Sequence, residues 1–112
     1  MGGAPRPCSH CSPLSQLSIE LLNKAVADEL SVIHQYLYFH SHLDDSGFGA
    51  LANLFKRTAI TETGHVERLA ERIPFLKGEV ELTLSTPVAK IDDLVKMLAK
   101  AVEMEKASVV GL

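Results

Sequence analysis

The sequence has no tryptophan, and aromatic residues make up only 5% of its 112 residues, so any core must be mostly aliphatic. No apolar run approaches the roughly 20 residues that a membrane-spanning helix needs, and no signal peptide precedes the first expected helix. Basic residues are outnumbered by acidic ones, and a net charge of −3 provides no basic face for nucleic acid. These absences predict a protein that binds neither membranes nor nucleic acid.

Cysteine is also scarce: Cys8 and Cys11 form one C-x-x-C, with His10 between them. Two cysteines without a signal peptide do not make a secreted disulfide framework, which predicts a cytoplasmic protein. Ser12 follows Cys11, so the C-x-x-C-H signature of covalent haem attachment is not met. Two interpretations stay open for this pair: two free thiols on a flexible tail, or a metal or intersubunit bridge whose other ligands come from another copy.

What the sequence does contain is helical periodicity, with 46% apolar residues. A Pro-, Gly- and Ser-rich flexible leader is expected over residues 1–17, and one helical domain over residues 18–112. The periodicity predicts helices over residues 18–44 and 48–77, and a third that starts after Pro87 or nearer Ile91. A turn signal, Asp-Asp-Ser-Gly, separates the first two.

The connection from Glu79 to Lys90 has a different pattern. Val80, Leu82 and Leu84 alternate with polar residues, which indicates an extended chain. Twelve extended residues span roughly 40 Å, about the length of a 27-residue helix. The sequence therefore predicts an all-α protein with two long antiparallel helices and a third helix after a long crossover, as in part of a four-helix bundle.

Three glutamates lie at the centres of apolar helical stripes, at about 100° per residue: Glu29, Glu62 and Glu105. His65 projects beside Glu62, and His40 lies on the same side of its helix as Glu29. The apolar neighbours within about 60° are Leu22, Val26, Ile33, Tyr36 and Leu43 around Glu29; Leu51, Phe55, Ala59, Val66, Leu69, Ile73 and Leu76 around Glu62; and Ile91, Leu94, Leu98, Ala101, Val102 and Val109 around Glu105.

A buried carboxylate without a partner is very costly, so these stripes require cations. Lys77 and Lys90 are the basic residues that come near a stripe centre, and both lie at segment ends. A bound metal ion is the simpler source of this positive charge, because Glu-x-x-His on one helix and a single Glu on another is the ligand set of di-iron bundles. Carboxylates with imidazole suit iron or manganese. The alternative, solvated or salt-bridged carboxylates, requires three separate coincidences.

Three blocks of sequence resemble the first three helices of the bacterioferritins. They are LLNK (21–24), DEL (28–30) and IHQY (33–36); ETGH (62–65) and ERIPFLKG (71–78); and ML (97–98) with AVEME (101–105). The resemblance covers roughly residues 18–110, and the candidate ligands fall inside these blocks.

The resemblance implies a ferroxidase that stores or detoxifies iron and assembles with itself, as a dimer and then a larger cage. By this resemblance Glu29, Glu62, His65 and Glu105 are the ligands of a di-iron centre. Tyr36 corresponds to the tyrosine beside that centre and takes a catalytic role. Two Fe²⁺ would bind, be oxidised by O₂ or peroxide, and leave as Fe³⁺ toward a mineral.

The sequence departs from the family because the fourth helix, with its own Glu-x-x-His, has no counterpart before Leu112. We expect a homodimer in which the first two helices of each chain form the bundle, so that Glu29, Glu62 and His65 are each used twice. Glu105 is then an added ligand or a residue of a relocated helix. The competing expectation keeps three helices and an incomplete site.

A second departure concerns haem. The methionine that ligates haem in the family is replaced by Thr63, which leaves His34 as an alternative intersubunit ligand. The competing interpretation places His34 and His42 on a surface or interface.

Arg57 and Thr61 stand where the family has inner-surface iron ligands. The rival function is a non-catalytic haem-binding or structural cage subunit that associates with a full-length ferritin.

Overall fold

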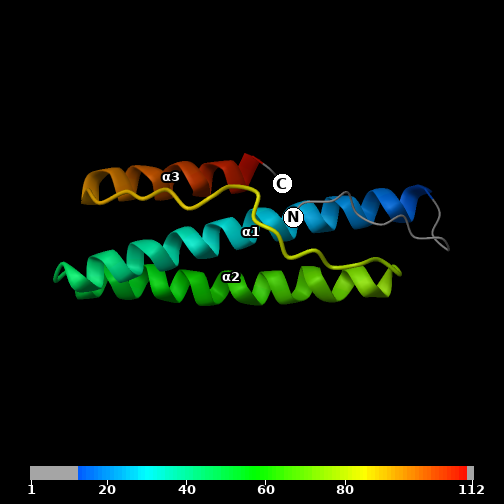
Figure 1. Cartoon of the computed structure of the whole chain (residues 1–112), viewed down its shortest axis with the longest axis horizontal. Helices are drawn as coiled ribbons and strands as arrows, with labels where there is room; N and C mark the ends of the chain where they lie inside the picture. Colours follow the sequence, from blue (N-terminus) through cyan, green and yellow to red (C-terminus); the bar gives the residue numbers. More distant parts are fainter. Residues whose placement is uncertain (1–12, 111–112) are drawn as a thin grey trace.

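The computed structural model describes residues 13–110 of the chain. Its helices are α1 (Pro13–Asp45), α2 (Gly49–Phe75) and α3 (Leu94–Val110), and the described residues contain no strand. Figure 1 shows α1 and α2 side by side and antiparallel, with α3 beside the C-terminal half of α1. The predicted all-α order of two long helices, a crossover and a third helix is confirmed.

The start of α1 was predicted wrongly. The helix already includes Pro13, the first residue that the structure describes, whereas the sequence predicts its start at Ser18. The C-x-x-C with His10, and the rest of the leader up to residue 12, lie outside the described residues. The turn after α1 is confirmed: the helix ends at Asp45, and Gly47 has a φ of 88°, which favours glycine.

The end of α2 also differs from the prediction. The helix ends at Phe75 and contains Pro74, whereas the pattern had placed its end at Lys77. Lys77 has a φ of 67°, and the Gly78 N–H donates to the Ile73 carbonyl at 2.9 Å, which closes the helix.

The crossover, residues 76–93, is fixed to α1 by side chains of that helix. The Asn23 amide donates to the carbonyl of Glu79 at 2.9 Å and accepts from the Glu81 N–H at 3.0 Å. The Gln35 amide pairs in the same way with both backbone groups of Ala89, at 3.0 and 2.8 Å. Both amides are buried, so the crossover satisfies polar groups that would otherwise be costly inside the protein. The predicted extended return along the bundle is confirmed.

The core lies mainly between α1 and α2. Phe55 of α2 packs against two rings of α1, with centroids 5.3 Å from Tyr36 and 5.4 Å from Phe39. The stripes predicted around Glu29 and Glu62 supply most of this core. Its buried members are Ile19, Val26, Ile33, Tyr36, Phe39 and Leu43 of α1 and Ala52, Phe55, Ala59, Val66 and Ile73 of α2.

The stripe predicted around Glu105 is confirmed in part: Ile91, Leu94 and Ala101 pack against the core. Leu98 and Val102 are exposed, and Met97 is the buried side chain of α3, with Met104 packed beside it. The helix contacts α1 alone among the described helices, so only one narrow side is covered. Because α3 is apolar over a wide surface, its period could not determine which side that would be.

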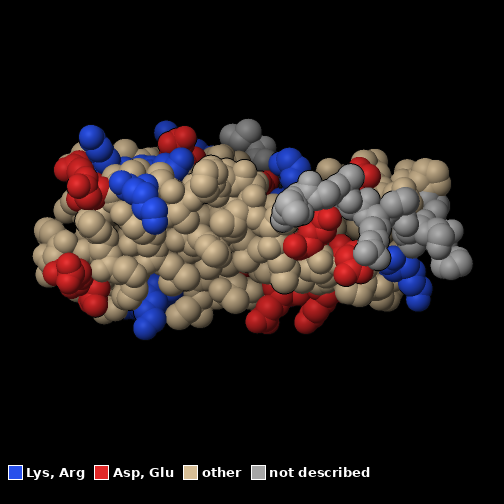
Figure 2. Space-filling view, in the orientation of Figure 1, with Lys and Arg blue, Asp and Glu red and all other residues tan. Residues whose placement is uncertain are grey.

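The third helix starts later than expected, at Leu94. Asp93 stands just before it, and its Oδ2 accepts the N–H of Lys96 at 3.1 Å, as an N-cap does. None of the described helices is long and apolar enough to cross a bilayer. Figure 2 shows acidic and basic side chains at both ends of one face, with a wide uncharged area between them.

Candidate metal centre

Glu29, Glu62 and His65 come together at the centre of the α1–α2 pair. Each offers one ligand atom, and these atoms all lie within 4.8 Å of one another. Glu29 is the middle residue of the 33-residue α1, and Glu62 is the middle residue of the 27-residue α2. Both glutamates are half-buried and His65 is exposed. The structure thus brings together three of the four predicted ligands.

Negative charge is concentrated at this cluster. Burial raises the pKa of Glu29 from 4.5 to about 8, helped by its hydrogen bond to Glu62 and by the charges of Glu62, Glu105 and Asp28. His65 Nδ1 donates to Glu62 Oε2 at 3.1 Å. Crowded carboxylates beside an imidazole form a donor set that fits Fe²⁺, because a cation replaces the shared proton and relieves the repulsion.

Glu105 is held next to this cluster by Tyr36. The Tyr36 hydroxyl donates to Glu105 Oε1 at 2.6 Å, and Tyr36 is only 2% exposed. Burial, and then the bond to Glu105, raises the pKa of Tyr36. Glu105 is exposed and lies outside the three-residue group, although its charge acts on Glu29. The structure therefore pairs Glu105 with Tyr36, and its role as a ligand stays a prediction.

A cavity of about 480 Å³ opens beside the cluster, between α1, the crossover and the end of α3. Its wall includes all three glutamates, and also Lys24 and Lys100, whose place there was not predicted. Lys24 pairs with Asp28 at 3.2 Å, an i,i+4 spacing that could have been read from the sequence. The position of Lys100 depends on how α3 packs, and no local signal gives it.

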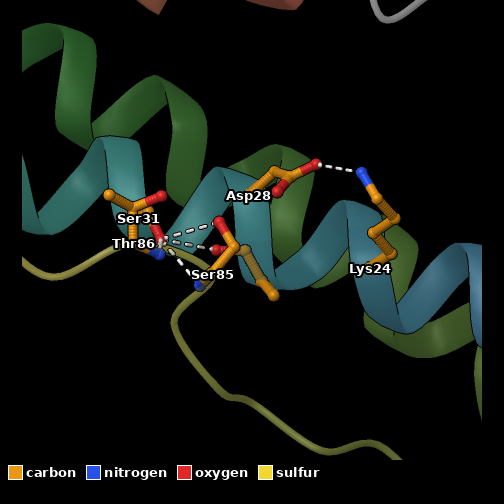
Figure 3. A network of polar contacts seen from close by, with 6 residues as sticks. Lys24, Asp28, Ser31, Ser85 and Thr86 are labelled. Carbon is orange, nitrogen blue, oxygen red and sulfur yellow. Dashed lines mark hydrogen bonds and ion pairs between the residues drawn. The ribbon is translucent and has the colours of Figure 1, made fainter.

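The crossover forms one wall of this cavity, over residues 85–87. The Ser31 hydroxyl oxygen accepts the N–H groups of Ser85 and Thr86 at 2.9 and 3.0 Å. Figure 3 shows this network beside the Lys24–Asp28 pair, with Ser31 reaching from α1 to the crossover. One serine hydroxyl therefore fixes the crossover where it passes the cluster.

The other described histidines do not join the centre. His34 is exposed, and His42 stacks on Tyr38 with ring centroids 5.9 Å apart. His40 Nδ1 donates to the carbonyl of Ala52 at 2.8 Å and so joins α1 to α2. Thr63, at the haem-ligand position, donates to the carbonyl of Ala59 in its own helix. Haem ligation by His34 stays a prediction.

Comparison with known proteins matches a model of the ferritin-like domain to residues 19–111. The bacterioferritin of Desulfovibrio desulfuricans is 54% identical over 61 residues, which cover 54% of this chain and 34% of that protein. The bacterioferritin of Brucella melitensis is 34% identical over 83 residues, covering 74% of this chain and 51% of that one. The chain thus spans about a third to a half of these curated relatives.

Solved structures agree with this match. One is the D. desulfuricans bacterioferritin, determined with its diiron site in different catalytic states; it has a TM-score of 0.82 at 38% identity and covers 85% of this chain and 56% of its own. Another is the Rhodobacter capsulatus bacterioferritin with a metal-free dinuclear site, with a TM-score of 0.77 at 28% identity, covering 82% and 57%.

Proposed function

This chain belongs to the ferritin-like family, and from that premise we propose that it binds iron and oxidises Fe²⁺ to Fe³⁺ at a di-iron site, for iron storage or detoxification. The observation that carries the proposal is the meeting of Glu29, Glu62 and His65 ligand atoms within 4.8 Å at the middle of two long helices. The D. desulfuricans relative has a diiron site, and it matches this chain at 38% identity over most of the described fold.

Each residue of the cluster contributes a different chemical group to the proposed site. Glu29 and Glu62 offer carboxylates that favour the ferric state and can bridge two irons, and His65 supplies an imidazole. Glu29 gives up its proton when the substrate Fe²⁺ binds, since its pKa of about 8 leaves it protonated at neutral pH. Each Fe²⁺ loses one electron to O₂ or peroxide. In the single chain, Tyr36 holds the Glu105 carboxylate at the edge of the cluster.

A second copy of the chain completes the ligand set in this proposal. A full di-iron bundle uses two single glutamates and two Glu-x-x-His motifs. The described residues contain one such motif at the cluster, Glu62 with His65. Two copies related by a twofold axis supply every ligand. A single copy supplies half of them, and Glu105 would then stand in for the second single glutamate.

The test is iron oxidation by the purified chain. Anaerobic protein titrated with Fe²⁺ and then given O₂ should develop a ferric absorption band that saturates near one di-iron site for each pair of chains. Glu62→Ala with His65→Ala should abolish this band. The matched control, Glu71→Ala with His42→Ala, removes an acid and a histidine away from the cluster and should leave the band intact. Oxidation at the wild-type rate by the first variant would refute the proposal.

A further inference from the structure

The N-terminal half of α1 exposes three large apolar side chains on one side. Leu14, Leu17 and Leu21 are 77%, 52% and 59% exposed, and their spacing of three and four residues places them along one face of the helix. Nothing within the described residues covers them. We call these three leucines the open stripe.

The open stripe continues the surface on which α3 rests. At about 100° per residue, Leu14 and Leu21 lie within about 60° of Tyr36 and Phe39, farther along the same helix. Tyr36 bonds to Glu105 of α3. Because α3 has 17 residues and α1 has 33, α3 lies along the C-terminal half alone (Figure 1). The face of α1 is therefore twice as long as the helix that covers it.

The positions of the glutamates supply the symmetry that the open stripe needs. Glu29 and Glu62 are the middle residues of α1 and α2. Consider a twofold axis at right angles to both helices, at the level of these two residues. It would place α1 antiparallel to the α1 of a second copy, and α2 antiparallel to the α2 of that copy, each over its full length. It would also duplicate Glu29, Glu62 and His65 at one place. The leucines of one copy would then meet the partner's face around Phe39.

We propose that a second copy of this chain packs its α1 antiparallel on the open stripe, centred at Glu29, and takes the position that α3 holds in the single chain. The proposal rests on the proposed function, because the shared site is the reason for a twofold axis at this position. The partner's α1 would cover the open stripe, and it would replace α3 along the rest of α1.

Two features of α3 suit such an exchange. It contacts α1 but not α2, and it exposes Val95 (72%) and Val102 (54%) on its outer side. An apolar outer face lets α3 pack elsewhere once it is displaced. The cavity lies at the end of α3 and is lined by Ala25, Glu29 and Val32, so the centre of the α1 face is hollow where the partner's ligands would enter.

The first test is the mass in solution. Wild-type chain at micromolar concentration should be a dimer by light scattering after gel filtration. Leu21→Glu should raise the dimer dissociation constant by about 10- to 100-fold, because it buries a charge at the interface. The control is Ile60→Glu on α2, since Ile60 is 61% exposed and Leu21 is 59% exposed. A monomeric wild type, or equal effects of the two substitutions, would overturn the proposal.

The second test locates the twofold axis. In a chain with Cys8→Ser and Cys11→Ser, Asp28→Cys would lie about 10 Å from its copy across two packed helices, within reach of a short bismaleimide. Leu17→Cys would lie about 36 Å from its copy along the axis. We expect cross-linked dimers from the first variant and none from the second. The reverse pattern would place the axis near the start of α1, leave α3 in place, and refute the exchange.

These results separate the interface from the chemistry. A monomer that oxidises iron at full rate would remove the proposed interface and leave the proposed function standing. A wild-type chain that forms the dimer and does not oxidise iron would leave the interface standing and remove the proposed function.

Discussion

Glu29 stands at the centre of α1 with the carboxylates of Asp28, Glu62 and Glu105 acting on it. Burial and these charges favour its protonated form, and a divalent cation is the natural replacement for that proton. One residue therefore links the charge of the site to the stability of the metal-free protein.

The stability of the metal-free protein should fall as pH rises from about 4.5 to about 8. Glu29 keeps its proton in the folded state up to about pH 8, whereas its ordinary pKa is 4.5. Between these values the folded state holds more protons, so the free energy of unfolding decreases with rising pH. Urea unfolding at pH 5 and pH 8 should show a smaller difference for Glu29→Gln than for wild type. Glu103→Gln, an exposed acid, should keep the wild-type difference, and an unchanged difference in Glu29→Gln would contradict the assignment.

Two glycines allow a matched test of local packing. A Cβ at Gly78 would lie 2.7–2.9 Å from side-chain carbons of Ile19, so Gly78→Ala should destabilise the protein by about 1–3 kcal/mol. At Gly64, between the ligands, a Cβ would meet only Arg68 Nη2 at 4.0 Å. Gly64→Ala should therefore stabilise α2 by about 1 kcal/mol. Thermal unfolding of both variants checks this, and equal shifts in one direction would refute the reasoning.

The cluster could be predicted at this scale because its residues lie on two regular helices. A period of about 100° per residue placed Glu29, Glu62 and His65 toward one axis without any knowledge of the loops. The bond between Tyr36 and Glu105 could not be predicted, since it depends on the rotation of α3 about its own axis. That rotation is determined by packing that involves Met97 rather than by the pattern within α3.

Among the elements, α3 is the one held by the fewest interactions. Its attachment consists of Met97 buried at 1% exposure, a few partly buried neighbours and the Tyr36–Glu105 hydrogen bond. Elements with little buried contact open most readily from the native state. The α1–α2 pair contains nearly all of the buried core, so it should stay folded when α3 detaches.

In the monomeric chain, which the Leu21→Glu background provides, removal of the Tyr36 hydroxyl should loosen α3 selectively. Tyr36→Phe keeps the ring against Phe55 but removes the donor to Glu105, at a cost of about 1–2 kcal/mol to the docking of α3. Amide hydrogen exchange should increase by about tenfold in α3 and stay nearly constant in the middle of α2. Equal acceleration in both helices would show that the bond supports the whole fold instead.

The crossover should depend on the two buried amides of α1. Gln35→Leu removes both bonds to Ala89 and leaves those backbone groups without their partner, at a cost of about 1–3 kcal/mol. Ser41→Ala removes an exposed bond within α1 and should change stability by less than about 0.5 kcal/mol. Urea midpoints measure both. The extended course was predictable from alternation, but these attachments were not, because Asn23 and Gln35 resemble ordinary polar residues on a helix surface.

On the scale of the whole molecule, the chain brings together three candidate ligands and covers one half of a long apolar face of α1. The α1–α2 pair is symmetric about its glutamates, whereas α3 makes the single chain asymmetric. Sequence alone predicted that a partner is needed, from the count of ligands. It could not locate the surface, because the exposure of the leucines follows from where α3 stops along α1.

Subunit mixing tests whether two chains share one centre. Wild type and the Glu62→Ala, His65→Ala variant, mixed in equal amounts and refolded together, should form dimers at random, because both chains keep the leucines of the open stripe. Mixed dimers then hold one Glu-x-x-His instead of two and should not oxidise iron. The mixture should have about a quarter of the rate of the same total amount of wild type, whereas independent chains would give about a half. Stopped-flow absorbance after addition of Fe²⁺ and O₂ measures the rate, and mixing without refolding provides the control at about a half. A refolded mixture that also stays at a half would mean that each chain works alone.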